Sequence, residues 1–232
     1  MSLRIIGNSE NLRNVFKKAD EIDYESGRVA YYKYQVLMKS LAKQYGCTIE
    51  QATAVFVSTS PNNDYKKNLR STVSILYGLK HGIPENRIRI STYNHCRKRA
   101  LSFLNGTDFL KVTRGPKIRS FFKNIVNPED PSKPVTVDGH VIGAWSGKKI
   151  LMKDAAVSNF NYEDIAGAMR KLADHAGLEP CQFQAIIWFT WKRIHRTVFD
   201  QNLDLFGDHW GLDVDPTKIR PFKYTKSKEP WD

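Results

Sequence analysis

Hydrophobic side chains along this chain recur mostly at helical spacing, and the alternating stretches typical of strands are scarce. Residues 31–46 are predicted to form a helix, because Val36, Leu37, Leu41 and Tyr45 recur at helical spacing and Gly46 is a natural stop. The chain carries no internal repeat, so the sequence predicts an all-α fold. The same periodicity predicts further helices over residues 49–57, 65–79, 92–104, 117–125, 162–176 and 182–199, a short one at 107–111 and another after Asp138.

The connecting segments set the expected domain organisation. A Pro-rich loop covers residues 127–134, and the chain from residue 216 onward is basic and shows no periodicity. A length of 232 residues allows one large domain or one domain built of two lobes. We therefore expect residues 1–215 to form a single compact two-lobed helical domain and residues 216–232 to form a basic C-terminal tail.

Composition excludes several protein classes. Hydrophobic residues make up 41% of the chain and charged residues 26%, which argues against wholesale disorder and low-complexity sequence. No apolar run approaches the roughly 18 residues of a membrane span. The three cysteines lie far apart and lack CxxC spacing, which argues against a disulfide scaffold, a metal site or an iron–sulfur cluster. We expect a cytoplasmic protein that needs no membrane, metal or cofactor.

Positive charge is concentrated in one part of the chain. The chain has 36 Lys and Arg against 24 Asp and Glu, a net charge of +12. Between Arg87 and Lys123, ten basic residues stand against the single acid Asp108, which gives this stretch a charge of +9. A second basic cluster lies between Lys218 and Lys228. Such clustering is typical of a phosphate-binding face, although a solvated basic surface has the same composition.

A candidate phosphate-binding turn joins two of the predicted helices. In the segment VTRGPK (112–117) we expect a tight turn in which Gly115 lets the backbone approach a ligand closely. The helix opened by Pro116 presents free N–H groups, and Lys117 adds a positive charge. Asp138 follows 21 positions after Lys117, within the string VTVDGHV (135–141).

This combination resembles the catalytic region of the helix-hairpin-helix (HhH-GPD) superfamily of DNA glycosylases, which includes the endonuclease-III-like enzymes. The segment GPK (115–117) is similar to the end of the family's G-x-G-x-K hairpin, and VDGH (137–140) is similar to its V-D-x-H string. The segment VFVSTSPNND (55–64) is similar to an early helix of that family that ends in a polar segment facing DNA. The likeness covers roughly residues 49–141.

The resemblance implies a two-lobed glycosylase-like fold that acts as a monomer on double-stranded DNA with one base flipped out. The cell would be a bacterium or a phage-infected host. Two departures stand out. Thr113 replaces the first hairpin glycine of the family, and the four-cysteine cluster of many relatives is absent, so no iron–sulfur cluster is expected.

By the resemblance, catalysis belongs to Asp138 and Lys117. A carboxylate beneath the sugar stabilises the positive charge that develops when the glycosidic bond breaks. A lysine amine in its neutral form, which burial or nearby basic groups favour, can form a Schiff base that permits strand cleavage. A flipped base leaves a gap in the duplex that other side chains fill. The residues expected to contact DNA are Arg114, Gly115, Pro116, Arg119, Asn62, Asn63 and His140.

Each of these residues also has a structural interpretation. Lys117 can bind phosphate without catalysis, and Asp138 can cap the helix that it opens. His140 is expected to be structural rather than a base, and the two asparagines are common turn formers. For Trp188 and Trp191 we favour core packing, with stacking on a base as the alternative.

Three functions therefore stay open. The first is a DNA N-glycosylase, with Schiff-base lyase activity through Lys117. The second is a phage-type enzyme that modifies a thymine-derived base, because the SPNND string (60–64) and the helix around Trp188 are similar to the α-glutamyl/putrescinyl thymine pyrophosphorylase group. The third is a catalytically inactive DNA-binding module.

Overall fold

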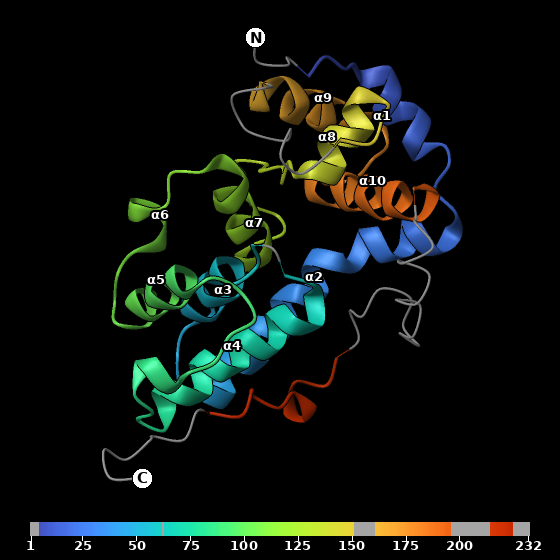
Figure 1. The fold of residues 1–232 in the computed structure, drawn as a ribbon. Helices are drawn as coiled ribbons and strands as arrows, with labels where there is room; N and C mark the ends of the chain where they lie inside the picture. The colour runs from blue at the N-terminus through green and yellow to red at the C-terminus, as the bar shows by residue number, and fades with distance from the viewer. Residues whose placement is uncertain (1–4, 62, 151–160, 196–213, 225–232) are drawn as a thin grey trace. The chain divides into compact units, whose positions relative to one another are not determined.

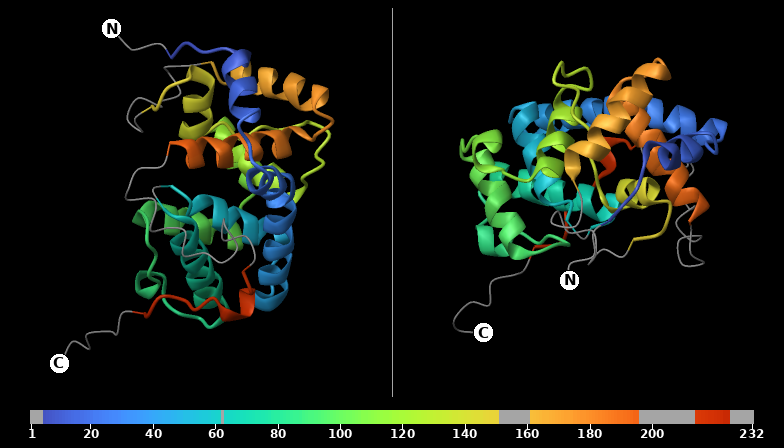
Figure 2. Two further views of the ribbon diagram at one scale, coloured as in Figure 1. Left: turned by 90° about the vertical axis from the view of Figure 1, so that its right-hand side faces the viewer. Right: turned by 90° about the horizontal axis from the view of Figure 1, so that it is seen from above.

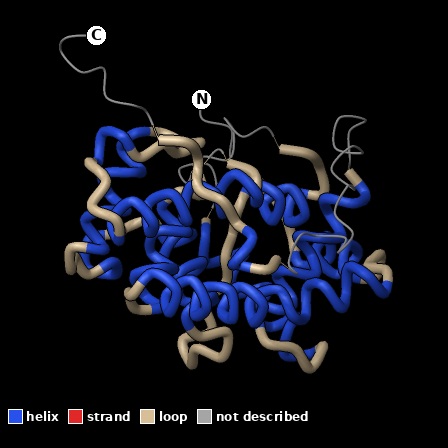
Figure 3. Tube along the Cα trace, turned by 90° about the horizontal axis from the view of Figure 1, so that it is seen from below, coloured by secondary structure: helices blue, strands red, loops and turns tan. Residues whose placement is uncertain are grey.

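The computed structural model describes residues 5–61, 63–150, 161–195 and 214–224. All regular structure in these ranges is helical, as the tube in Figure 3 shows, which confirms the prediction of an all-α protein. None of the described helices combines the length and the apolar character that a membrane crossing requires. The chain divides into two compact units: unit 1 holds Met1–Tyr34 and Gly115–Leu212, and unit 2 holds Gln35–Arg114 and Asp213–Asp232.

Unit 1 is built around helix α10, which contacts α1, α8 and α9 (Figure 1). Its core side chains are fully buried, among them Leu12, Val141, Ile165 and Ile187. Trp191 of α10 packs so closely on Gly143 of α8 that a Cβ at Gly143 would lie 2.9 Å from the indole nitrogen. The helices of unit 1 are α1 (Ser9–Phe16), the first part of α2 (Glu21–Tyr45), α7 (Pro116–Val126), α8 (Gly139–Ser146), α9 (Tyr162–His175) and α10 (Pro180–Ile194).

Unit 2 is built around α3, which packs on both α4 and α5. Thr48 and Gln51 form a reciprocal capping box at the start of α3, and every residue from Ala52 to Ser58 is buried. The helices of unit 2 are the second part of α2, α3 (Ile49–Ser58), α4 (Tyr65–Lys80), α5 (Asn94–Leu104) and α6 (Phe109–Val112), with the 3-10 helices η1 (Glu85–Arg87) and η4 (Pro216–Lys218).

The C-terminal segment 214–224, drawn in red in Figure 2, lies along α4 of unit 2. The backbone N–H of Phe222 donates to Ser74 Oγ at 2.8 Å, and Arg70 Nε donates to the carbonyl of Arg220 at 3.3 Å. The Arg70 guanidinium also lies 4.2 Å from the centre of the Phe222 ring. Although this segment has no hydrophobic periodicity, its backbone and rings are therefore held by specific contacts.

Most predicted helices are confirmed to within a few residues, but α1, the start of α2 and the end of α10 differ from the prediction. Helix α1 and the first ten residues of α2 were not expected, because residues 21–30 are mostly polar or small. At the other end, α10 stops at Ile194 with His195 as its C-cap, five residues before the predicted end. Residues 21–30 of α2 can pack as a helix because their few buried positions are small or ion-paired, as Gly27, Ala30 and Asp23 illustrate.

Asp23 is a buried carboxylate held by an ion pair. Its Oδ2 accepts from Arg193 Nε of α10 at 2.7 Å, and the same nitrogen lies 3.0 Å from Asp20. Burial raises the pKa of Asp23 above its ordinary value, and the Arg193 charge opposes that rise. This pair fixes the start of α2 against the end of α10.

A pair of glycine substitutions tests how closely α2 and α10 approach. A Cβ at Gly27 would lie 2.5 Å from the backbone nitrogen of Ile186, whereas a Cβ at Gly167 in α9 would meet open space. Gly27→Ala should lower the free energy of unfolding by about 1–3 kcal/mol, because a backbone has to move. Gly167→Ala should raise it by up to about 1 kcal/mol through helix propensity. Urea unfolding followed by circular dichroism measures both, and equal effects would contradict the close approach.

Candidate active site and nucleic-acid interface

Asp138 stands at the N-terminus of α8, with both oxygens of its carboxylate hydrogen-bonded. The preceding residues Val135 and Val137 are buried, which anchors the extended chain that leads to it. Its Oδ1 accepts from the backbone N–H of Val141 at 2.9 Å, so Asp138 is the N-cap of α8. Its Oδ2 accepts from Trp188 Nε1 of α10 at 2.7 Å. The carboxylate is therefore fixed in orientation while the residue stays partly exposed.

Trp188 is the centre of a small cluster beside this carboxylate. The Lys192 ammonium lies 4.2 Å from the centre of the indole ring, and the His140 ring meets it edge-on at 5.7 Å. Trp188 is half-buried, whereas Trp191 is buried in the core. Core packing is thus confirmed for Trp191, and the role of Trp188 as the partner of Asp138 was missed. The sequence signal for this role was the tryptophan itself, because an indole N–H that is removed from water needs a hydrogen-bond acceptor.

Lys117 is the second residue of α7 and is exposed. Its helix is tied to the segment before Asp138 by the Tyr162 hydroxyl, which donates to the Val135 carbonyl at 2.6 Å and accepts from the Val137 N–H at 3.1 Å. The same hydroxyl lies 3.4 Å from Ser120 Oγ, which follows Lys117 by about one helical turn. Tyr162 therefore fastens the first turns of α7 to the chain that positions Asp138.

The expected tight glycine turn is wrong. Thr113 has φ −92° and ψ 116°, and Gly115 has φ −66° and ψ 123°, so this connection is extended. A Cβ at Gly115 would meet open space, and the backbone conformation there is one that any residue adopts. Pro116 does open α7, as predicted, and no side chain caps this helix. Arg114 is exposed and Arg119 is half-buried.

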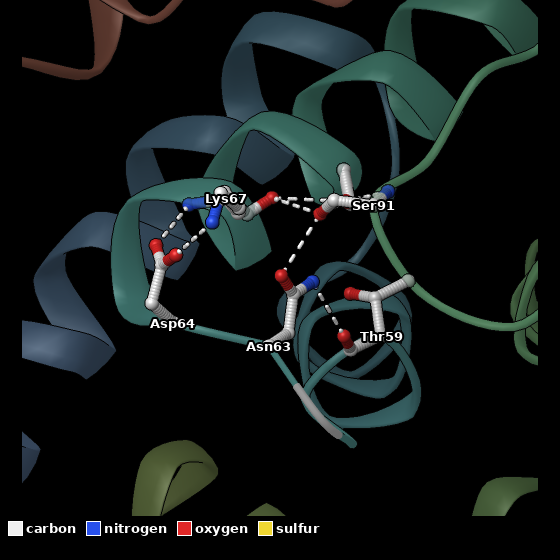
Figure 4. A network of polar contacts seen from close by, with 6 residues as sticks. Thr59, Asn63, Asp64, Lys67 and Ser91 are labelled. Carbon is white, nitrogen blue, oxygen red and sulfur yellow. Dashed lines mark hydrogen bonds and ion pairs between the residues drawn. The ribbon is translucent and has the colours of Figure 1, made fainter.

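Asn63 belongs to a polar network at the start of α4, which Figure 4 shows. Its Nδ2 donates to the Thr59 carbonyl at 3.0 Å, and its Oδ1 accepts from Ser91 Oγ at 2.9 Å. Asp64 caps α4 and pairs with Lys67 at 2.8 Å. Both polar groups of Asn63 are thus used within unit 2, which favours its turn-forming interpretation. Asn62 lies outside the described residues.

The two units differ sharply in charge. Unit 2 holds 18 Lys and Arg against eight Asp and Glu, a net charge of +10, whereas unit 1 holds 18 against 16, a net charge of +2. The excess charge therefore belongs to unit 2, and the carboxylate site belongs to unit 1. Basic residues of unit 2 that are exposed include Arg89, Lys98, Arg99, Lys111 and Arg114.

Among the described residues, no group of three or more His, Cys, Asp or Glu side chains is placed to hold a metal ion. The thiols are free, and Cys181 donates to the Pro128 carbonyl at 3.2 Å. Burial raises the pKa of Cys181 to about 12, so this thiol is unsuited to nucleophilic chemistry.

These features define a class of protein. All regular structure in its described residues is helical, one of its two units carries an oriented carboxylate, and the other unit is strongly basic. Residues 6–195 match the family of unknown function DUF7178, and this match covers most of the chain, so the protein belongs to that family. The matched range contains Lys117, Asp138 and Trp188, and it stops before the C-terminal segment on α4. No curated protein and no solved structure matches the chain.

A double-mutant cycle tests whether Trp188 and Asp138 interact as the structure has them. Trp188→Phe removes the N–H donor and should lower the free energy of unfolding by about 1.5–3 kcal/mol, the range for a hydrogen bond to a charged group. Asp138→Ala also removes the cap, at a cost of about 0.5–2 kcal/mol. The double variant should lose about 1 kcal/mol less than the sum of the singles. Strict additivity in urea unfolding would contradict the bond.

Proposed function

We propose that this protein is a DNA-binding enzyme that acts on a base outside the double helix, with N-glycosidic bond hydrolysis as its reaction. The observation that carries the proposal is the Asp138 carboxylate, oriented by two hydrogen bonds and partly exposed. A carboxylate held in this way can face the sugar carbon and stabilise the positive charge that develops as the base departs. The likeness of VDGH (137–140) to the glycosylase motif supports the same role.

Lys117 has a separate role in this proposal. A lysine acts as a nucleophile only in its neutral form, which burial usually favours, and Lys117 is exposed. We therefore assign base release by water to Asp138. This release leaves an abasic sugar with an aldehyde, and we assign to Lys117 only the condensation of its neutral amine with that aldehyde, which loses water and gives the Schiff base that leads to strand cleavage. In this arrangement the open N-terminus of α7 and the Arg119 side chain contact the phosphates that flank the flipped nucleotide.

Unit 2 supplies the affinity for DNA in this proposal. Its net charge of +10 suits a polyanion, and its exposed arginines and lysines can replace counterions along the phosphate backbone. Phosphate contacts of this kind position the protein without reading sequence. The base would be recognised at the carboxylate site, where the half-buried Trp188 and the exposed His140 offer aromatic side chains.

Base release by Asp138 variants tests the reaction. On duplexes that carry deaminated, alkylated, oxidised or hydroxymethylated bases, Asp138→Asn should release base at least about 100-fold more slowly than wild type, with DNA affinity within about twofold. Asp174→Asn, an equal change of charge on the exposed side of α9, should match wild type. Alkali-labile strand breaks report release. DNA binding without release on any substrate would leave the inactive module, and a new side chain on the base in nucleoside mass spectra would establish modification instead.

Adding borohydride to the same reactions tests the role of Lys117 separately from base release. Wild type should give a covalent protein–DNA adduct, and Lys117→Ala should lose it while base release stays within about threefold. Lys123→Ala removes another amine of α7, bonded to Ser132 Oγ at 3.0 Å, and should keep the adduct. An adduct of full yield with Lys117→Ala would assign the Schiff base to another amine.

Two triple variants of equal charge test the assignment of DNA affinity to unit 2. Arg89→Ala/Lys98→Ala/Arg114→Ala and Lys17→Ala/Lys148→Ala/Lys171→Ala each remove three exposed positive charges, from unit 2 and unit 1 respectively. The unit 2 variant should bind duplex DNA more weakly, and the slope of log K against log salt should fall by up to about 3. The unit 1 variant should keep the wild-type slope. Equal losses in fluorescence anisotropy titrations would show that net charge alone matters.

A further inference from the structure

A small cavity in unit 2 lies outside the carboxylate site. It has a volume of about 170 Å³, is partly open to solvent, and is lined by the C-terminal ends of α2 and α4 together with residues 217–221. Its walls include Tyr45, Tyr77, Lys80, His81 and Arg220. Three of these side chains can carry positive charge, and among the described residues that line the cavity none is Asp or Glu.

Aromatic rings form one wall of this cavity. The Tyr77 ring lies 4.1 Å from the ring of His81 and 5.8 Å from the ring of Tyr224, the latter in a stacked arrangement with an interplanar angle of 21°. The Tyr224 hydroxyl is buried without a hydrogen-bond partner among the described residues, and burial raises its pKa to about 12. Faces of this kind accept a flat ring irrespective of its hydrogen-bonding edge.

Positively charged side chains also line the cavity. Helix C-termini carry partial negative charge, which would repel an anion. Lys80 offsets the partial negative charge at the C-terminus of α2. Its Nζ donates to the Gln44 carbonyl at 2.6 Å and lies 5.9 Å from the centre of the Tyr45 ring. Arg220 lines the same cavity as Tyr45, whose pKa is raised by burial and lowered by the Arg220 charge. An arginine can bind a phosphate through two parallel hydrogen bonds.

We propose that this cavity binds a nucleotide, with the phosphate on Arg220 and Lys80 and the base against the Tyr77 and His81 rings. The volume is below the roughly 300 Å³ at which pockets for drug-sized ligands begin, so the cavity is too small for a dinucleotide cofactor, and a mononucleotide bound there would extend into solvent. Tyr45, Tyr77, Lys80 and His81 lie within residues 6–195, which match the family, whereas Arg220 lies beyond them.

Isothermal titration of the full chain tests the proposal, with deoxythymidine monophosphate, thymidine and inorganic phosphate as probes. The monophosphate should bind at least about tenfold more tightly than either part alone. Arg220→Ala should weaken it by at least about tenfold. Lys218→Ala removes an equal charge from the same segment, where Lys218 faces Asp215 at 3.6 Å, and should leave binding within about twofold.

Further variants separate this site from folding and from the proposed reaction. Tyr77→Leu should weaken binding and Tyr77→Phe should restore it, since the ring is the stacking group. Asp138→Asn should bind the monophosphate as wild type does, because the cavity belongs to unit 2, so loss of the proposed glycosylase activity leaves this result unaffected. Absence of heat for wild type at millimolar nucleotide, or equal weakening by Arg220→Ala and Lys218→Ala, would overturn the proposal.

Discussion

Unit 1 depends on α10, a mostly buried helix whose buried and half-buried polar side chains need partners. Ten of the 15 residues of α10 are buried, and a polar group left unpaired in such a position costs about 1–3 kcal/mol. Gln184 therefore accepts from the Tyr31 hydroxyl at 2.7 Å, Trp188 donates to Asp138, and Arg193 pairs with a buried carboxylate of α2. These bonds set α2 and α8 against α10. The orientation of the Asp138 carboxylate follows from the Trp188 indole N–H together with the backbone N–H of Val141 that it caps.

The two units differ in their net charge. Unit 1 is nearly balanced, which suits a core that contains paired ions and an oriented carboxylate. Unit 2 carries the excess positive charge on exposed side chains and in the segment 214–224, whose rings and backbone are held on α4. Net charge far from zero destabilises a compact unit through self-repulsion, and a bound polyanion would offset that repulsion. Both the proposed DNA contact and the proposed nucleotide site would place phosphate groups against the positive side chains of unit 2.

The sequence predicted most helices because their signals are local. Gly46, Gly106 and Gly177 follow their helices with φ between +66° and +92°, and Pro116 opens α7 as expected. The misses have physical causes. Residues 21–30 present a polar pattern because their inward positions are small or ion-paired, so periodicity does not reveal them. Gly115 was given a conformational role from its residue type, but the extended connection there does not use it.

For the candidate site, the sequence by itself determined that Asp138 would open a helix after a buried apolar stretch, since an N-cap is a contact between near neighbours in the chain. It also determined the basic excess, because composition is independent of folding. Only the tertiary structure decided that Trp188, 50 positions later, holds the second oxygen, and that Tyr162 ties α7 to the Asp138 segment. Both are contacts between distant parts of the chain, and they follow from which helices pack together.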